Sequence, residues 1–407
     1  MYLRNSPNIC IAVFLITFFS CAYGTKRDIH CTIYHAFDKN ESKENVDVFH
    51  VSATGSKDTV HYLWSSYKLP SVIIARTTSD TLLNVSLSKL RTFVTDAIKF
   101  SETPIEYVGL TISELLEFTY NSDTAEVNHP NSTRKLNLES FLWSSMNDSY
   151  SCSPKAASTK LNSYDNDDDF SKNGTFQVQF SVIGDQVMAD DFPHLMFTGN
   201  STQIKVILDH LHSNSSKTRY SLEFIVLSPQ SGDCSSNQWR SHVKKAISDE
   251  HSPGIFSDIT LSPVCTKKND HSFISWRPVS YTDKTSSIEA SSDVKITSDI
   301  KPHAITSVRS IAELYFGGKP NMSINAFNIT FGTVGDGFYR KTEYTAWSLM
   351  VGTGTTVSIG LSSIAILYAS IGLSALVLFF ASGGIFLAIQ RCWRKDDDLL
   401  LSNNSVN

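Results

Sequence analysis

The chain has 407 residues, of which 41% are hydrophobic and 18% are charged. Lys and Arg (35) nearly balance Asp and Glu (40), so the net charge is −5. This balance excludes the strongly basic surface by which proteins bind nucleic acid, and we expect no nucleic-acid partner. The length suffices for one large or two ordinary domains.

The first 24 residues have the pattern of a cleavable signal peptide. Arg4 precedes an apolar run from Ile9 to Phe19, and the segment ends in Ala22-Tyr23-Gly24. The run is too short to span a bilayer, and small residues at the last and third-from-last positions suit cleavage after Gly24. We therefore expect residues 25–356 to enter the oxidising secretory pathway and form a luminal part.

The luminal part repeatedly alternates apolar and polar residues. The apolar members are Val60, Tyr62 and Trp64; Phe176, Val178, Phe180 and Val182; Ile204, Val206 and Leu208; and Leu222, Phe224 and Val226. Because a half-buried strand has a period of two, many such runs separated by turn-rich stretches indicate packed antiparallel sheets. The sequence predicts a mostly β, sandwich-like domain, either undivided or split into two subdomains near residues 165–173. Helical patterns are few, at Ser241 to Glu250 and from Leu87 to Ile98.

Nine N-x-[ST] sequons lie in the luminal part. They are Asn40, Asn84, Asn131, Asn147, Asn173, Asn200, Asn214, Asn321 and Asn328. Asn84 and Asn328 each alternate with apolar residues, so on a half-buried strand their side chains point away from the core. We therefore predict a heavily N-glycosylated domain.

The sequence offers little catalytic chemistry. The Gly-x-Ser-x-Gly, His-Glu-x-x-His and Walker motifs are absent from it. Asp165, Asp167 and Asp169 resemble the start of a calcium loop, but Phe170 and Phe176 stand where that loop needs glycine and glutamate. We expect no enzyme activity, no cofactor and no bound metal.

A second apolar segment lies near the C-terminus. Residues 364–389 carry no charge and reach roughly 39 Å as a helix, enough to cross a bilayer. We expect the transmembrane segment to be 357–390, and the basic residues that follow predict that the tail, 391–407, lies in the cytosol. Ala365, Ala369 and Gly372 fall on one helical face, where a second helix can approach closely. That helix belongs either to a partner protein or to a second copy of this chain.

The cysteines sort by compartment. Cys10 and Cys21 leave with the signal peptide, and Cys392 lies beyond the membrane helix. The four luminal cysteines are Cys31, Cys152, Cys234 and Cys265. An even luminal count predicts two disulfides; three pairings are possible, and we favour Cys31–Cys152 with Cys234–Cys265.

The tail contains an acidic dileucine pattern. Asp396 stands four positions ahead of Leu400 and Leu401. Adaptor proteins bind such leucine pairs when the segment is extended and mobile, so we predict an endosomal or lysosomal address. Exposed leucines without a binding partner are an aggregation liability, which favours this interpretation over a solvated acidic stretch.

Several stretches together resemble the glycosylated lysosomal membrane protein family. They are Val60–Ser66, Leu69–Pro70, Val72–Ala75, Asp249–Phe256, Trp276–Tyr281, Ala326–Gly332 and Tyr344–Met350. The resemblance implies a non-enzymatic accessory subunit that associates with a lysosomal major facilitator superfamily dipeptide transporter and shields it from luminal proteases. It brings no catalytic residues.

Two features depart from the family pattern. The tail lacks the family's tyrosine-based sorting signal, so the dileucine would have to replace it, and Ser323-Ile324-Asn325 stands where a cysteine is expected. The residues alone also leave open a cell-surface adhesion or receptor-like β-sandwich protein. A luminal hydrolase whose reacting groups converge only in the fold is a third class.

Overall fold

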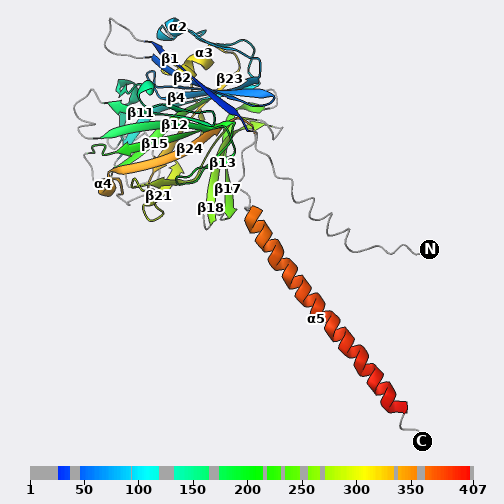
Figure 1. The fold of residues 1–407 in the computed structure, drawn as a ribbon. Helices are drawn as coiled ribbons and strands as arrows, with labels where there is room; N and C mark the ends of the chain where they lie inside the picture. The colour runs from blue at the N-terminus through cyan, green and yellow to red at the C-terminus, as the bar shows by residue number, and fades with distance from the viewer. Residues whose placement is uncertain are drawn as a thin grey trace. The chain divides into compact units, whose positions relative to one another are not determined.

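The computed structural model describes residues 26–36, 46–92, 94–118, 133–164, 174–213, 218–230, 234–247, 255–265, 271–333, 338–354 and 363–403. These residues form two compact units, which we describe separately. The larger unit contains residues 26–245 and 257–354 and holds nearly all the strands. The smaller unit consists of the ends of one β-ribbon and the C-terminal helix (Figure 1).

The first half of the larger unit contains these strands: β1 (Asp28–Ala36), β2 (Val46–Thr54), β3 (Asp58–Ser65), β4 (Ser71–Thr78), β5 (Leu83–Val85), β6 (Ile98–Phe100), β7 (Glu106–Phe118), β8 (Thr133–Asn137), β9 (Leu142–Trp143), β10 (Ser151–Cys152), β11 (Ala156–Tyr164) and β12 (Thr175–Ile183). The later strands are β13 (Val187–Met188), β14 (Met196–Phe197), β15 (Ser201–Asp209), β16 (Arg219–Pro229), β17 (Cys234–Ile247), β18 (Ile255–Cys265), β19 (Phe273–Trp276), β20 (Val279–Tyr281), β21 (Ser291–Ile296), β22 (Lys301–Pro302), β23 (Met322–Phe331) and β24 (Tyr344–Gly352). The helices are α2 (Leu87–Arg91), η1 (Leu138–Ser140), η2 (Met146–Asp148), α3 (Ile311–Gly317), α4 (Phe338–Thr342) and α5 (Ser363–Asn403).

The strands build two antiparallel sheets. In the first, neighbours follow the order β1, β2, β3, β4, β7, β16 and β23, with β8 beside the C-terminal half of β7. In the second, the order is β11, β12, β15 and β24, and β19 and β20 pair along the far side of β24. This arrangement confirms the predicted mostly β, antiparallel fold.

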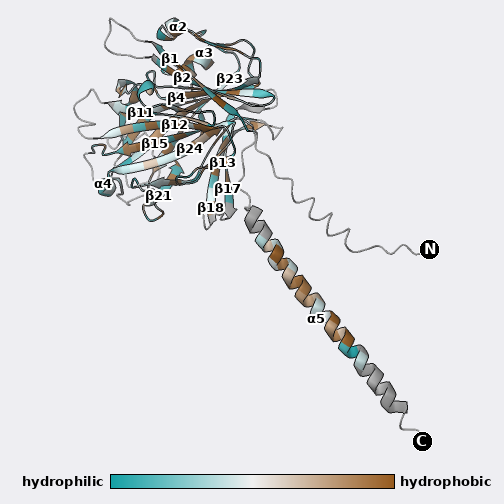
Figure 2. Ribbon diagram, in the orientation of Figure 1, coloured by the Kyte–Doolittle hydropathy of each residue, from teal (hydrophilic) through white to brown (hydrophobic). Residues whose placement is uncertain are grey.

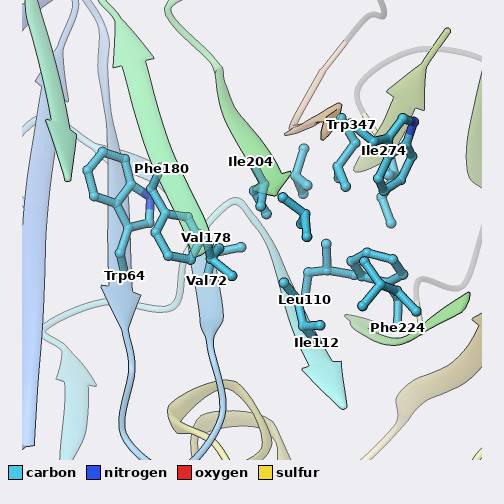
Figure 3. Packing of buried hydrophobic residues seen from close by; sticks show 14 of the residues in the cluster. Trp64, Val72, Leu110, Ile112, Val178, Phe180, Ile204, Phe224, Ile274 and Trp347 are labelled. Carbon is cyan, nitrogen blue, oxygen red and sulfur yellow. The ribbon is translucent and has the colours of Figure 1, made fainter. Parts of the chain in front are cut away.

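The main core lies between the two sheets. The predicted alternating residues face it: Phe176, Val178, Phe180 and Val182 of β12 are buried, while the residues between them are half-buried. Trp64 of β3 stacks on Phe180 across the sandwich, and Figure 3 shows the two side chains together. Their ring centroids are 5.6 Å apart. The sequence period therefore identified the buried face correctly.

A second apolar layer covers the outer face of the first sheet. The helix α3 places Ile311, Leu314 and Phe316 against strands β3, β4, β7 and β16. Gly109 of β7 allows this approach, because a Cβ there would lie 2.8 Å from the Phe316 ring. Ser310 caps the helix by accepting the Glu313 N–H at 3.1 Å.

Contacts at both lateral edges join the sheets. On one side the Cys31–Cys152 disulfide links β1 to β10. On the other side β21 pairs with β20 of the second sheet and with β23 of the first. Strand edges that are paired or covered are poor starting points for another chain or for local opening.

Three expectations from the sequence need correction or comment. The predicted helix from Ser241 is wrong, because β17 continues as a strand to Ile247 beside β18. Long-range strand pairing here overrides the local preference of lysine and alanine for helix. Residues 165–173 lie outside the described residues, but the flanking strands β11 and β12 pair with each other, so the segment connects neighbours in one sheet. Of the described residues from Leu87 to Ile98, Leu87–Arg91 form a helix and Ile98 begins β6.

Candidate functional site

The described sequon asparagines differ in how accessible they are. Asn84, Asn147 and Asn321 are exposed. Asn200 is half-buried, and its side-chain oxygen accepts a hydrogen bond from Arg27 Nε at 2.9 Å. Asn40, Asn131, Asn173 and Asn214 lie outside the described residues. Three sequons are thus openly presented for a glycan.

Asn328 is covered although its neighbours follow the predicted alternation. Phe327, Ile329 and Phe331 are part of the main core. Asn328 itself is only 8% exposed. Its N–H donates to Ser298 Oγ at 2.9 Å, and its carbonyl accepts the Thr297 N–H at 3.1 Å. The strand period indicates the face of a residue but not what covers that face.

The position of Asn147 depends on a buried carboxylate that the sequence analysis missed. Asp47, 1% exposed, lies in hydrogen-bond contact with His35 Nδ1. Its other oxygen accepts hydrogen bonds from Ser145 Oγ at 2.6 Å and from the Met146 N–H at 3.1 Å. These bonds hold η2, which carries Asn147, against β2. Asp47 and Ser145 are 98 residues apart in the chain, so no local motif indicates the contact.

A histidine pair lies under the outer layer of the first sheet. His50 Nε2 and His61 Nδ1 are 3.0 Å apart, and His61 Nε2 lies 3.2 Å from Thr77 Oγ1. Burial, with a smaller contribution from His61, lowers the pKa of His50 to about 3, and burial lowers the pKa of His61 to about 4. Both imidazoles are therefore neutral in a mildly acidic compartment.

Paired carboxylates also occur on the first sheet. Glu223 of β16 stands opposite Glu114 of β7. Burial and the nearby Glu114 charge raise the pKa of Glu223. Ser113 Oγ donates to Glu223 at 3.0 Å, and Lys135 Nζ pairs with Glu114 at 3.0 Å. Both carboxylates thus have partners within the domain, which favours a structural role.

The described residues contain no group of three His, Cys, Asp or Glu that could hold a metal ion.

The luminal disulfides are partly described. The structure joins Cys31 and Cys152, one of the two pairs that the sequence favours. Cys265 is also disulfide-bonded. The side chain of Cys234 lies outside the described residues. The Cys234–Cys265 pair therefore stays a prediction.

The helix α5 has the length and composition to cross a membrane. The apolar stretch runs from Tyr368 to Arg391, and its side chains are exposed. Figure 2 shows the hydrophobic colour along this stretch. Ala369 and Gly372 lie within it, and a Cβ on Gly372 would meet nothing within 4 Å. The side chain of Ala365 lies outside the described residues, so the shared small-residue face stays a prediction.

The backbone of the tail differs from the expectation of an extended segment. The helix continues to Asn403 and includes Asp396, Leu400 and Leu401, whose side chains lie outside the described residues. Residues 390–403 contain no glycine or proline to end a helix. Binding of the leucine pair in an extended form would therefore require this last part of the helix to unwind.

A closed β sandwich and one described helix of membrane-spanning length define a membrane-anchored β-domain protein. The glycosylated lysosomal membrane protein family model matches residues 47–394. The chain belongs to this family of lysosomal membrane glycoproteins.

Curated relatives share this description. Glycosylated lysosomal membrane protein A of Xenopus laevis is 26% identical, covering 78% of this chain and 80% of the relative. The human glycosylated lysosomal membrane protein is 27% identical, with 84% of each chain covered. The Danio rerio protein is 25% identical, covering 85% of this chain and 84% of the relative.

Proposed function

We propose that this chain is a non-enzymatic accessory subunit of a multispan transporter in the lysosomal membrane. On this proposal the β domain lies in the lumen, the helix α5 crosses the membrane once, and the tail faces the cytosol. The domain covers luminal loops of the partner and protects them from proteases. The transported substrate class, dipeptides, follows only from the family resemblance given above.

The main support is the combination of family membership with a domain built to resist opening. Proteolysis begins at exposed, locally unfolded segments. Here a disulfide closes one lateral edge of the sandwich, and β21 bridges the other. Exposed Asn84, Asn147 and Asn321 can carry glycans that screen the surface further. A resistant domain that binds a partner favours the covered state by mass action.

The membrane helix supplies a second contact on this proposal. Transmembrane helices pack closely where small residues face each other. Ala369 and Gly372, with Ala365 one turn before, offer such a face to a helix of the transporter. Replacing Ala369 and Gly372 by leucine should reduce recovery of the complex, whereas Leu378→Ala on the opposite face of the same helix should leave it intact. Equal recovery from both variants would rule out this packing face.

The experiment that tests the proposal is purification of the tagged full chain from lysosomes in mild detergent. We expect one multispan transporter to be recovered in near-equal amount. Recovery of the chain alone would refute the accessory-subunit function. A distribution at the cell surface that Leu400→Ala and Leu401→Ala leave unchanged would instead favour the adhesion or receptor-like class.

A further inference from the structure

The strand β17 carries a cluster of exposed basic residues. Arg240, His242, Lys244 and Lys245 are all exposed. None of them forms an ion pair or hydrogen bond with another side chain among the described residues. Many other described basic residues do pair, as Arg277 does with Asp258 at 3.5 Å. In a chain of net charge −5, these four basic residues form a local basic surface, and Asp299 is the acidic residue that lines the groove beside them.

A groove lies beside the same strand. Its volume is about 550 Å³, and one wall consists of Gln238, Trp239, Arg240 and Ser241. Successive residues of a strand point to opposite faces, so a groove that touches four in a row follows the edge of the strand. The opposite wall is formed by residues 296–300 and Pro302. Lys301, also exposed, stands between them and adds a further positive charge.

The groove has an apolar floor and a polar rim. Trp239 is 3% exposed, and its indole N–H donates to Ser228 Oγ at 3.3 Å, which fixes the ring. Ile296 and Ile300 pack against the main core from the other wall. Beyond the groove, Val243 is 65% exposed on the strand between the basic residues.

We propose that this β17 groove, defined by residues 238–245 and 296–302, binds an extended acidic segment of a protein partner. Extended peptides commonly add along a strand edge, where backbone pairing supplies affinity and side-chain contacts supply specificity. Acidic side chains would pair with Arg240 and Lys244, and an apolar side chain would rest over Trp239. A recessed groove along a strand edge fits a polypeptide segment, whereas a bilayer surface is too broad to enter it. This inference rests on the proposed function, because the segment would belong to the luminal side of the transporter.

The direct test uses the full chain in detergent and two fluorescein-labelled decapeptides. One alternates glutamate with valine and the other alternates lysine with valine. We expect the acidic peptide alone to bind, with an affinity that falls as salt rises. The triple variant Arg240→Glu, Lys244→Glu and Lys245→Glu should weaken binding about tenfold or more.

Matched controls separate the site from net charge and from misfolding. Lys57, Lys155 and Lys160 are exposed and make no side-chain ion pair among the described residues, so Lys57→Glu, Lys155→Glu and Lys160→Glu gives the same charge change elsewhere. That control should bind the acidic peptide like the unmodified chain. Ser241→Trp fills the groove without changing charge and should also weaken binding. Equal binding by the β17 variant and the control, or no binding by the unmodified chain, would overturn the inference.

Purification from lysosomes distinguishes this inference from the proposed function. If the unmodified chain recovers the transporter and the β17 triple variant loses it while the control keeps it, both hold. If all three forms recover the transporter equally, the β17 groove is not the contact but the accessory function stands. If the unmodified chain recovers no transporter, the proposed function fails, and the peptide experiment alone decides the groove.

Discussion

Removal of the Cys31–Cys152 disulfide should destabilise the luminal domain and make it sensitive to proteases. The two cysteines are 121 residues apart in the chain. For a loop of that length the chain-entropy model gives about 5 kcal/mol at 25 °C, and removal of native disulfides typically costs about 2–5 kcal/mol. For a domain of this size that corresponds to a fall in Tm of roughly 3–7 °C.

The assay is urea unfolding of the full chain carrying Cys31→Ser and Cys152→Ser, together with limited proteolysis at acidic pH. Thr32→Ser with Ser151→Ala provides a control on the same two strands with the disulfide intact. Amide exchange should accelerate first in β1 and β10, which the disulfide joins, and later in the central β24. A loss of less than about 1 kcal/mol, with unchanged proteolysis, would refute the view that this link holds the sandwich edge closed.

Three further predictions test the core, the histidine pair and the sequons. Trp64→Ala should lower the free energy of unfolding in urea by about 3–5 kcal/mol, because its ring is fully buried against Phe180. As a control, Leu82→Ala at a 74% exposed position should change this free energy by less than about 0.5 kcal/mol. Similar losses for the two variants would contradict the packing in Figure 3. The pKa values of His50 (about 3) and His61 (about 4) lie below the unfolded value of 6.5, so the unfolded state takes up protons first and stability falls as the pH drops from 6.5 towards 4. Between pH 7 and pH 5, the free energy of unfolding of the His61→Gln variant should therefore fall by about 2 kcal/mol less than that of the unmodified chain. An unchanged pH dependence would show that the buried histidine pair does not cause the loss of stability. Enzymatic deglycosylation in heavy-oxygen water followed by mass spectrometry should mark Asn84, Asn147 and Asn321 but leave Asn328 unmarked, since Asn328 is only 8% exposed. A marked Asn328 would contradict its burial in the mature protein.

The period of the sequence was sufficient to identify the buried faces of the sandwich. The alternation in β12, β15 and β16 arises because each strand has one face on the main core. Every second residue of such a strand is therefore apolar, and this period can be seen in the sequence. The membrane helix was equally readable, because an uncharged run of this length has few other interpretations.

Features that depend on distant residues were not readable. The strand β17 has helix-favouring residues, and only its pairing with β18 makes it a strand. The bond from Ser145 to Asp47 and the bond from the Asn328 N–H to Ser298 join segments far apart in the chain. The β17 groove requires residues 238–241 and 296–302 together, so its basic strand appears in the sequence only as scattered lysine, histidine and arginine.

The most direct test of the shielding function is the lifetime of the transporter that co-purifies with the chain. Its half-life would be followed by pulse-chase labelling in cells that lack this chain and in cells that express it again. We predict a shortened half-life without the chain, restored both by the full chain and by inhibitors of lysosomal proteases. A half-life that is the same with and without the chain would contradict the function proposed here.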